Sequence, residues 1–140
     1  MQHQDTGAAA ARLCVVKIGG NIIDHQDQLD RFLADFARIG GPKILVHGGG
    51  KIATAMGEKL GIISRYVNGR RVTDSGTIDL VTMVYGGLIN KKMVAALQGL
   101  GCDAIGLTGA DGDMIPAIKR PVKDVDFGFV GDVLGDRIDA

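Results

Sequence analysis

The chain has 140 residues, and its 16 basic and 16 acidic side chains give a formal net charge of zero. This length suffices for one domain, and the balanced charge argues against nucleic-acid and membrane-surface partners. Cys14 and Cys102 belong to no C-x-x-C pair, which favours buried, reduced thiols in a cytoplasmic protein. No apolar run approaches the roughly 20 residues of a membrane span. We expect residues 1–12 to form a flexible N-terminal extension before a domain over 13–140.

Strand and helix signals alternate over the first sixty residues. A β-branched run predicts a strand over 13–18, and apolar residues at helical spacing predict a helix over 26–39. A second strand is expected over 43–47, followed by a helix that begins after a triple glycine. This β-α-β-α order predicts a parallel sheet with right-handed crossovers.

The pattern changes after residue 65. Asn68-Gly69 between β-forming residues predicts a hairpin over 66–72. Asp74 or Ser75 can cap a nearly all-apolar helix, which we expect to be buried in the fold or against a partner subunit and to be interrupted at Gly86-Gly87. The last predicted elements are a helix up to Leu100, a third parallel strand over 104–107, and two strands of a hairpin or edge over 114–120 and 127–133. The whole pattern predicts an α/β fold with an open, mainly parallel sheet flanked by helices.

Two glycine clusters, Gly19-Gly20 and Gly48-Gly49-Gly50, directly follow the first two predicted strands. Turns of this kind meet at one edge of a parallel sheet, where open α/β folds bind ligands. Glycine N–H groups at helix N-termini bind anions, and Lys17 brings a cation to the same edge. The P-loop pattern fails because Ile52 follows Gly50-Lys51, and neither cluster has the G-x-G-x-x-G spacing. The clusters therefore predict an anionic ligand without either standard motif.

Other polar residues near these loops allow a functional and a structural interpretation. Arg70 and Arg71 follow the hairpin tip, where an arginine can bind a carboxylate in a bidentate manner, although a solvated hairpin is commoner for one arginine alone. His47 can act as a base, but a histidine at a strand end more often packs and hydrogen-bonds locally. Asp111-Gly112-Asp113 lacks the later positions of a calcium loop and is better interpreted as a turn.

Five segments together resemble the amino acid kinase family and, within it, the acetylglutamate kinases. In chain order they are 17–20 (KIGG), 47–50 (HGGG), 68–74 (NGRRVTD), 106–112 (GLTGADG) and 127–133 (FGFVGDV). Their order and spacing fit from Cys14 to Val133. The resemblance implies a three-layer α/β sandwich with a β-hairpin lid. It also implies that this chain is the N-terminal, acyl-amino-acid-binding half, truncated before the nucleotide-binding half.

The resemblance further implies an ATP-dependent phosphotransferase that acts on the γ-carboxylate of N-acetyl-L-glutamate in arginine biosynthesis. ATP with Mg²⁺ is then the co-substrate, and no tightly bound metal is expected. It assigns catalysis to Lys17, the ATP phosphates to Gly19 and Gly20, and acceptor binding to Gly49, Gly50 and Arg71. Because a carboxylate is ionised at pH 7, positioning and cationic donors carry such a transfer without a base. Family members often form dimers, so we expect a cytoplasmic homo-oligomer.

Two alternatives stay open. Segments 81–87 and 119–126 resemble a subgroup related to bacteria that use N-succinyl intermediates, so N-succinyl-L-glutamate is a second candidate acceptor. The second alternative is a non-catalytic module that binds an acylated amino acid, because the nucleotide-binding half is absent. For the same reason we expect the isolated 140-residue chain to be inactive.

Overall fold

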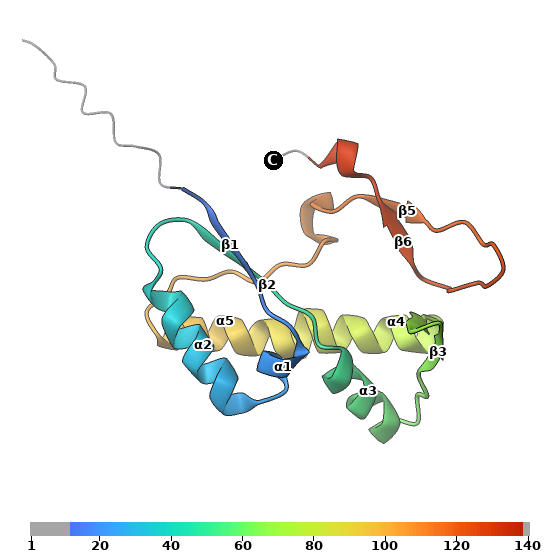
Figure 1. Ribbon diagram of the computed structural model, residues 1–140, viewed down its shortest axis with the longest axis horizontal. Helices are drawn as coiled ribbons and strands as arrows, with labels where there is room; N and C mark the ends of the chain where they lie inside the picture. Colours follow the sequence, from blue (N-terminus) through green and yellow to red (C-terminus); the bar gives the residue numbers. More distant parts are fainter. Residues whose placement is uncertain (1–11, 139–140) are drawn as a thin grey trace, which may run out of the picture.

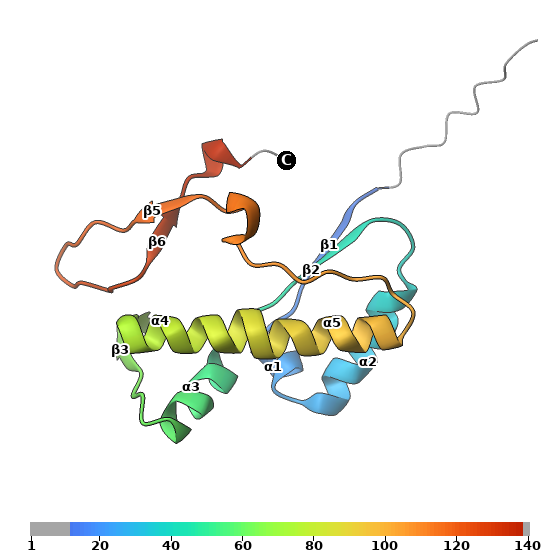
Figure 2. The same cartoon turned by 180° about the vertical axis from the view of Figure 1, so that it is seen from behind.

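The computed structural model describes residues 12–138, and the predicted N-terminal extension lies almost wholly outside them. Two parallel strands, β1 (Cys14–Lys17) and β2 (Lys43–Val46), form the central sheet. Lys17 is paired with Val46 at the C-terminal ends of the two strands. Helices pack below this sheet in the view of Figure 1, and the reverse view in Figure 2 shows the same arrangement. The predicted β-α-β-α order is confirmed.

Helices α1 (Gly20–Ile23) and α2 (Gln26–Arg38) lie between the two strands in the chain, and α3 (Gly50–Lys59) follows β2. Helix α2 buries Leu33 and Phe36, as its apolar spacing predicts. Helix α3 begins at the last glycine of the second cluster. Sequence analysis missed α1, because four residues are too few to show a helical period.

The predicted arginine hairpin is confirmed as β3 (Arg65–Val67) and β4 (Arg70–Val72), which pair antiparallel. Asn68 and Gly69 form its tip with φ angles of 50° and 75°, the conformation that a two-residue I′ turn requires. After β4, Thr73 donates to the Phe127 carbonyl at 2.8 Å and accepts from Phe129 at 2.7 Å. These bonds attach the C-terminal part of the chain to the hairpin. A lid function for this hairpin stays a prediction.

One continuous helix runs from Ser75 to Gly99, so the predicted interruption at Gly86-Gly87 is wrong. It consists of α4 (Ser75–Val81), a π-helical stretch η1 (Thr82–Ile89) and α5 (Asn90–Gly99). A glycine in a helix costs only about 1 kcal/mol relative to alanine, which surrounding contacts can offset. At Gly86 a Cβ atom would stand 3.1 Å from the Thr108 methyl group, so glycine allows a close approach. Asp74 caps the helix as predicted, accepting from the Thr77 amide at 2.8 Å.

The predicted third parallel strand over 104–107 is wrong, because this segment makes no strand pairing in the structure. Its carbonyl groups accept from side chains of α5 instead. Lys91 Nζ donates to Gly106 O at 2.9 Å, and Gln98 Nε2 donates to Ala104 O at 3.0 Å. The predicted C-terminal hairpin forms as the shorter strands β5 (Ala117–Lys119) and β6 (Gly131–Val133), with 3-10 turns η2 (Asp111–Asp113) and η3 (Gly135–Arg137).

The hydrophobic core lies between the inner face of the sheet and the helices. Its buried members are Ile18, Ile23, Leu33, Phe36, Ala53, Leu80, Val84, Ile89, Met93 and Leu97. The outer face of the sheet exposes Leu13, Val15, Ile44 and Val46. The α/β class is thus confirmed, while the described residues place helices on one face of the sheet only. Within residues 12–138, parallel pairing of strands is limited to β1 and β2, beside one isolated parallel bridge between Thr73 and Gly128. Both cysteines are half-buried rather than buried.

The helix Ser75–Gly99 is long and apolar enough to cross a membrane by length and composition alone. Sequence analysis missed this stretch because Asp79 and the glycine pair interrupt its apolar residues. A core helix of a globular domain passes the same test, so the finding is weak support for a span. Here the helix packs against α2 and α3 and buries Leu80 and Met93 in the core.

Candidate functional site

The two glycine clusters lie side by side at the C-terminal edge of the parallel sheet. The Ile18 amide donates to the Val46 carbonyl at 2.9 Å, which extends the pairing of the strands up to the clusters. Lys51 Nζ, in the first turn of α3, lies 3.2 Å from Asp24 Oδ2 at the end of α1. This ion pair connects the helices that the two clusters begin. The two clusters therefore meet at one edge of the sheet, as predicted from the sequence.

The first cluster is open to solvent. Gly19 caps α1 and Gly20 is its first residue, and both are exposed. A Cβ atom on Gly19 would meet nothing within 4 Å, and one on Gly20 would lie 3.2 Å from Asp24 Oδ2. Lys17, two residues before Gly19, is also exposed. The first cluster thus presents exposed backbone N–H groups and the exposed Lys17 cation on the same edge.

The second cluster is anchored in the core. Gly49 is buried and lies against Ile89 and Tyr85 of the long helix. A Cβ atom there would overlap the Ile89 side chain and approach the Tyr85 ring to 3.3 Å. Gly50 is exposed and starts α3. Glycine at Gly49 therefore lets the loop pack closely, which leaves Gly50 at the surface.

Arg71 reaches across from the hairpin to the first turn of α3. Its Nη2 donates to Gly50 O at 3.2 Å and to Thr54 Oγ1 at 2.7 Å. Nη2 and Nε also donate to the Tyr66 hydroxyl, at 2.8 and 3.2 Å. The remaining nitrogen, Nη1, is buried and has no hydrogen-bond partner among residues 12–138. The structure thus brings the predicted acceptor residues Gly50 and Arg71 into contact.

The environment of Tyr66 lowers the pKa of its hydroxyl group from the ordinary value. The hydrogen bond between the Thr54 and Tyr66 hydroxyl groups is the largest cause that lowers the pKa of Tyr66. Burial acts in the opposite direction, and the hydrogen bond and charge of Arg71 lower the pKa further. The Arg71 guanidinium also lies over the Tyr66 ring, with Cζ 5.4 Å from the ring centroid.

The local interpretation of His47 fits its contacts. Its Nδ1 lies 3.1 Å from Gly48 O, and its Nε2 lies 3.4 Å from Asn90 Nδ2. A proton on Nδ1 satisfies both contacts, because Nε2 then accepts from the amide. Asn90 also donates to Leu107 O at 3.4 Å. His47 therefore connects the second cluster to Asn90 of the long helix.

The turn interpretation of the Asp111 segment also fits. Asp111 Oδ2 accepts from the Thr108 amide at 2.6 Å and from its hydroxyl at 2.7 Å. These bonds to Thr108 lower the pKa of the Asp111 carboxyl group. Within residues 12–138, no group of three or more His, Cys, Asp or Glu side chains is arranged to hold a metal ion.

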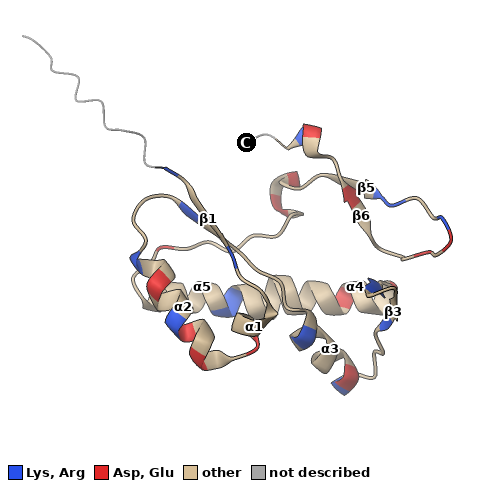
Figure 3. Cartoon of the chain, in the orientation of Figure 1, with Lys and Arg blue, Asp and Glu red and all other residues tan. Residues whose placement is uncertain are grey.

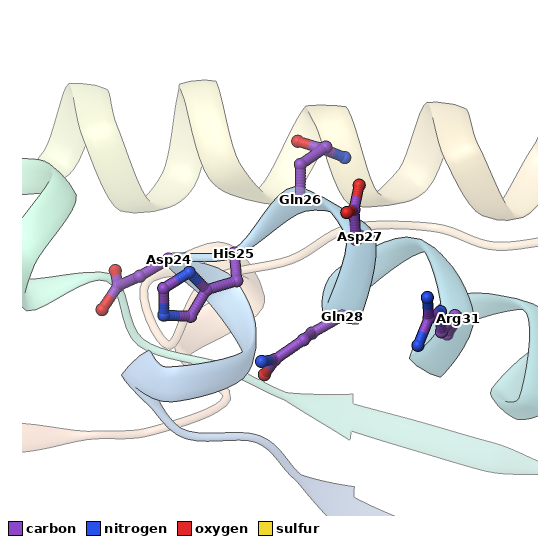
Figure 4. Close-up of a pocket in the computed structure, with 6 residues that line it drawn as sticks. All are labelled: Asp24, His25, Gln26, Asp27, Gln28 and Arg31. Carbon is purple, nitrogen blue, oxygen red and sulfur yellow. The ribbon is translucent and has the colours of Figure 1, made fainter.

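An open cavity of about 470 Å³ lies where α1 meets α2 (Figure 4). Its lining is polar and comprises Asp24, His25, Gln26, Asp27, Gln28 and Arg31. None of the residues predicted for the site lines it. Charged residues of both signs are interspersed along the helices and the C-terminal hairpin (Figure 3). We therefore place the candidate site at the glycine clusters rather than at this cavity.

Sequence analysis missed the partners of Arg71. Tyr66 stands opposite Arg71 in the hairpin register, which the two-residue Asn-Gly turn already determines. Thr54 follows Gly50 by one helical turn and donates to its carbonyl at 2.9 Å. Tyr66 and Thr54 could therefore have been predicted as partners of Arg71 once the turn and the start of α3 were assigned. The Asp24–Lys51 pair carries no such signal, because it joins two separate elements.

Glycine loops at the ends of the two parallel strands form the candidate site of this α/β fold, with Lys17 just before the first loop and Arg71 in contact with the second. A family model described as the amino acid kinase family matches residues 12–139. The chain belongs to this family. Its likeness is to the N-terminal portion of proteins named acetylglutamate kinase, and it spans about half the length of these relatives.

Relatives from distant organisms carry this name. The acetylglutamate kinase of Phocaeicola vulgatus is 58% identical over 122 residues, which is 87% of this chain and 48% of that protein. The Cytophaga hutchinsonii protein is 57% identical over 87% of this chain and 47% of its own length. The Methanopyrus kandleri protein is 42% identical over 85% of this chain and 47% of its own.

Solved structures agree on the fold. The Streptococcus mutans protein smu.665 matches with a TM-score of 0.64 at 25% identity, over 86% of this chain and 49% of that protein. N-acetylglutamate synthase from Neisseria gonorrhoeae, solved with coenzyme A and N-acetyl-glutamate, matches with a TM-score of 0.65 at 23% identity. That match covers 87% of this chain and 28% of the synthase, and at this identity it supports the fold alone.

Proposed function

We propose that this chain carries the acceptor-binding part of an ATP-dependent kinase that phosphorylates the γ-carboxylate of N-acetyl-L-glutamate, a step of arginine biosynthesis. The contact between Arg71 and Gly50 is the observation that carries the proposal. It places a guanidinium, the usual partner of a carboxylate, beside exposed backbone N–H groups at the start of α3. The name shared by relatives at 56–58% identity supports the same acceptor.

In this proposal the two clusters have separate tasks. Gly49, Gly50 and Arg71 bind the acceptor, with Arg71 on its α-carboxylate. Gly19 and Gly20 bind the phosphates of ATP, and Lys17 stabilises the transferring phosphoryl group. The pairing of Lys17 with Val46 supports this division, since it brings the cation to the edge where the second cluster begins.

The chemistry needs no general base. The attacking γ-carboxylate oxygen is already ionised at pH 7, and it forms a bond to the γ-phosphorus as the bond to the ADP oxygen breaks. The barrier lies in bringing two anions together and spreading charge over the phosphoryl oxygens. Cations and N–H groups fixed in advance lower that barrier. Lysine, arginine and glycine are the residue types that supply them.

Calorimetry of N-acetyl-L-glutamate binding to the 140-residue chain tests the acceptor assignment. Arg71→Ala should raise the Kd at least ~10-fold, because a charge-assisted pair to a carboxylate is lost. Arg65→Ala is the matched control. Arg65 is exposed in the same hairpin, and its side chain alternates to the opposite face from Tyr66. Equal affinity of the wild type and Arg71→Ala would remove Arg71 from the site.

Turnover is a separate question. With ATP, Mg²⁺, N-acetyl-L-glutamate and hydroxylamine, we predict no hydroxamate from the isolated chain above background, since it spans half the length of its relatives. A clear hydroxamate signal would contradict this. A homo-oligomer and a cytoplasmic location also stay predictions.

A further inference from the structure

We propose that Tyr66 and Thr54 are positioning residues, which fix the Arg71 guanidinium against the first turn of α3 and leave its Nη1 nitrogen for the acceptor carboxylate. This inference rests on the proposed function in its last part only. The network that holds Arg71 can be tested without any ligand.

The N–H groups of the Arg71 guanidinium differ in their hydrogen-bond partners. Arginine has five N–H groups in a rigid plane. The three on Nε and Nη2 are directed to the Tyr66 hydroxyl, Thr54 Oγ1 and Gly50 O, at 2.7 to 3.2 Å. The two on Nη1 have no partner in the described part of the chain, although the atom is buried. One edge of the fork is therefore held by protein oxygens, and the other is left unsatisfied.

The unpartnered Nη1 nitrogen is energetically unfavourable where it lies. A buried charged nitrogen without a partner is unfavourable, and such a group is normally satisfied by a protein group, an ordered water molecule, a ligand or an ion. An anion at Nη1 would supply the missing acceptor. It would lie beside Gly50, whose carbonyl already contacts Nη2. Nη1 is therefore the guanidinium nitrogen that is available to the acceptor carboxylate.

Tyr66 and Thr54 are themselves held in place, so they can fix the position of Arg71. Their oxygens lie 3.2 Å apart, and Thr54 is itself tied to Gly50 O at 2.9 Å. Tyr66 is fixed opposite Arg71 by the hairpin register. The guanidinium thus bridges the hairpin and α3, two elements that the sheet does not join. Without the two hydroxyl groups, Arg71 would keep its charge but lose its fixed orientation.

A titration tests the network by itself. The chain has two tyrosines and no tryptophan, so in a Tyr85→Phe background the near-ultraviolet absorbance of phenolate reports Tyr66 alone. We expect Tyr66 to titrate below the ordinary value of about 10. Arg71→Gln and Thr54→Val should each shift the titration to higher pH, and the control Arg65→Gln should leave it in place. No shift in either test variant would overturn the inference.

Acceptor binding tests the positioning role. Tyr66→Phe keeps the ring under the guanidinium and removes only the hydroxyl, so we expect a ~3- to 10-fold higher Kd for N-acetyl-L-glutamate. In an Arg71→Ala background the same change should add nothing, because Tyr66 acts through Arg71. Additive losses, or unchanged or tighter binding by Tyr66→Phe alone, would overturn the positioning role. If the wild-type chain binds no acceptor while the titration behaves as expected, the proposed function fails and the network stands.

Discussion

Single residues decide how closely the second glycine cluster can approach the long helix. Gly49 is buried against Ile89 and Tyr85, whereas a Cβ atom on Gly48 would meet nothing within 4 Å. The sequence identifies both as glycines of one cluster and does not distinguish them. Contacts from a helix some forty residues away make the difference. Sequence analysis could therefore predict the cluster but not which of its glycines is required.

Gly49→Ala should destabilise the chain by about 1–3 kcal/mol, because the added methyl group overpacks the site against Ile89. Gly48→Ala is the matched control, one position earlier in the same loop. Urea unfolding followed by circular dichroism measures both. Equal midpoints for the two variants would show that the loop does not pack on the helix as described.

At the scale of elements, local chemistry predicted most of the helices and failed where distant groups decide. Asp74 was a candidate cap from its residue type and position, and it accepts from Thr77 as expected. A third parallel strand was predicted over 104–107, yet α5 side chains donate to two of its carbonyl groups. Periodicity reports which side chains are buried, and it does not report which backbone groups pair.

The Asp74 cap makes the stability of the long helix depend on pH. Hydrogen bonds from Thr77 lower the pKa of the Asp74 carboxyl group below its ordinary value. The contribution is thus present above the unfolded pKa of about 4 and is lost as the pH falls through the lower folded pKa. Asp74→Asn keeps a capping oxygen that does not titrate. As the pH is lowered from roughly 5 to 2, the Tm of the wild type should fall further than that of Asp74→Asn. Parallel Tm curves would contradict the cap.

For the whole molecule, the uncovered outer face of the sheet is the main consequence of the fold. Leu13, Val15, Ile44 and Val46 expose their side chains there, while the described helices all cover the inner face. The sequence predicted a sheet flanked by helices, but not that the described helices would cover one face only. Relatives named acetylglutamate kinase have about twice the length of this chain.

This face should bind a fluorescent apolar dye, because contiguous exposed apolar surface is the usual dye site. Replacing Val15 and Ile44 together by threonine keeps β-branched side chains in the strands and should reduce the fluorescence severalfold. Ile63→Thr is the control, since Ile63 is 85% exposed and lies outside the sheet. A loss of fluorescence in the control instead would place the dye elsewhere.

A titration of ¹⁵N-labelled chain with N-acetyl-L-glutamate, followed by NMR, tests the central claim most directly. Gly49, Gly50 and Arg71 should form one acceptor site next to a separate donor loop at Gly19 and Gly20. The account predicts saturable shifts of the Gly49 and Gly50 amides and of Arg71 Nε, with the Gly19 and Gly20 amides moving little. Shifts confined to the cavity between α1 and α2, or to the Gly19-Gly20 loop, would contradict it.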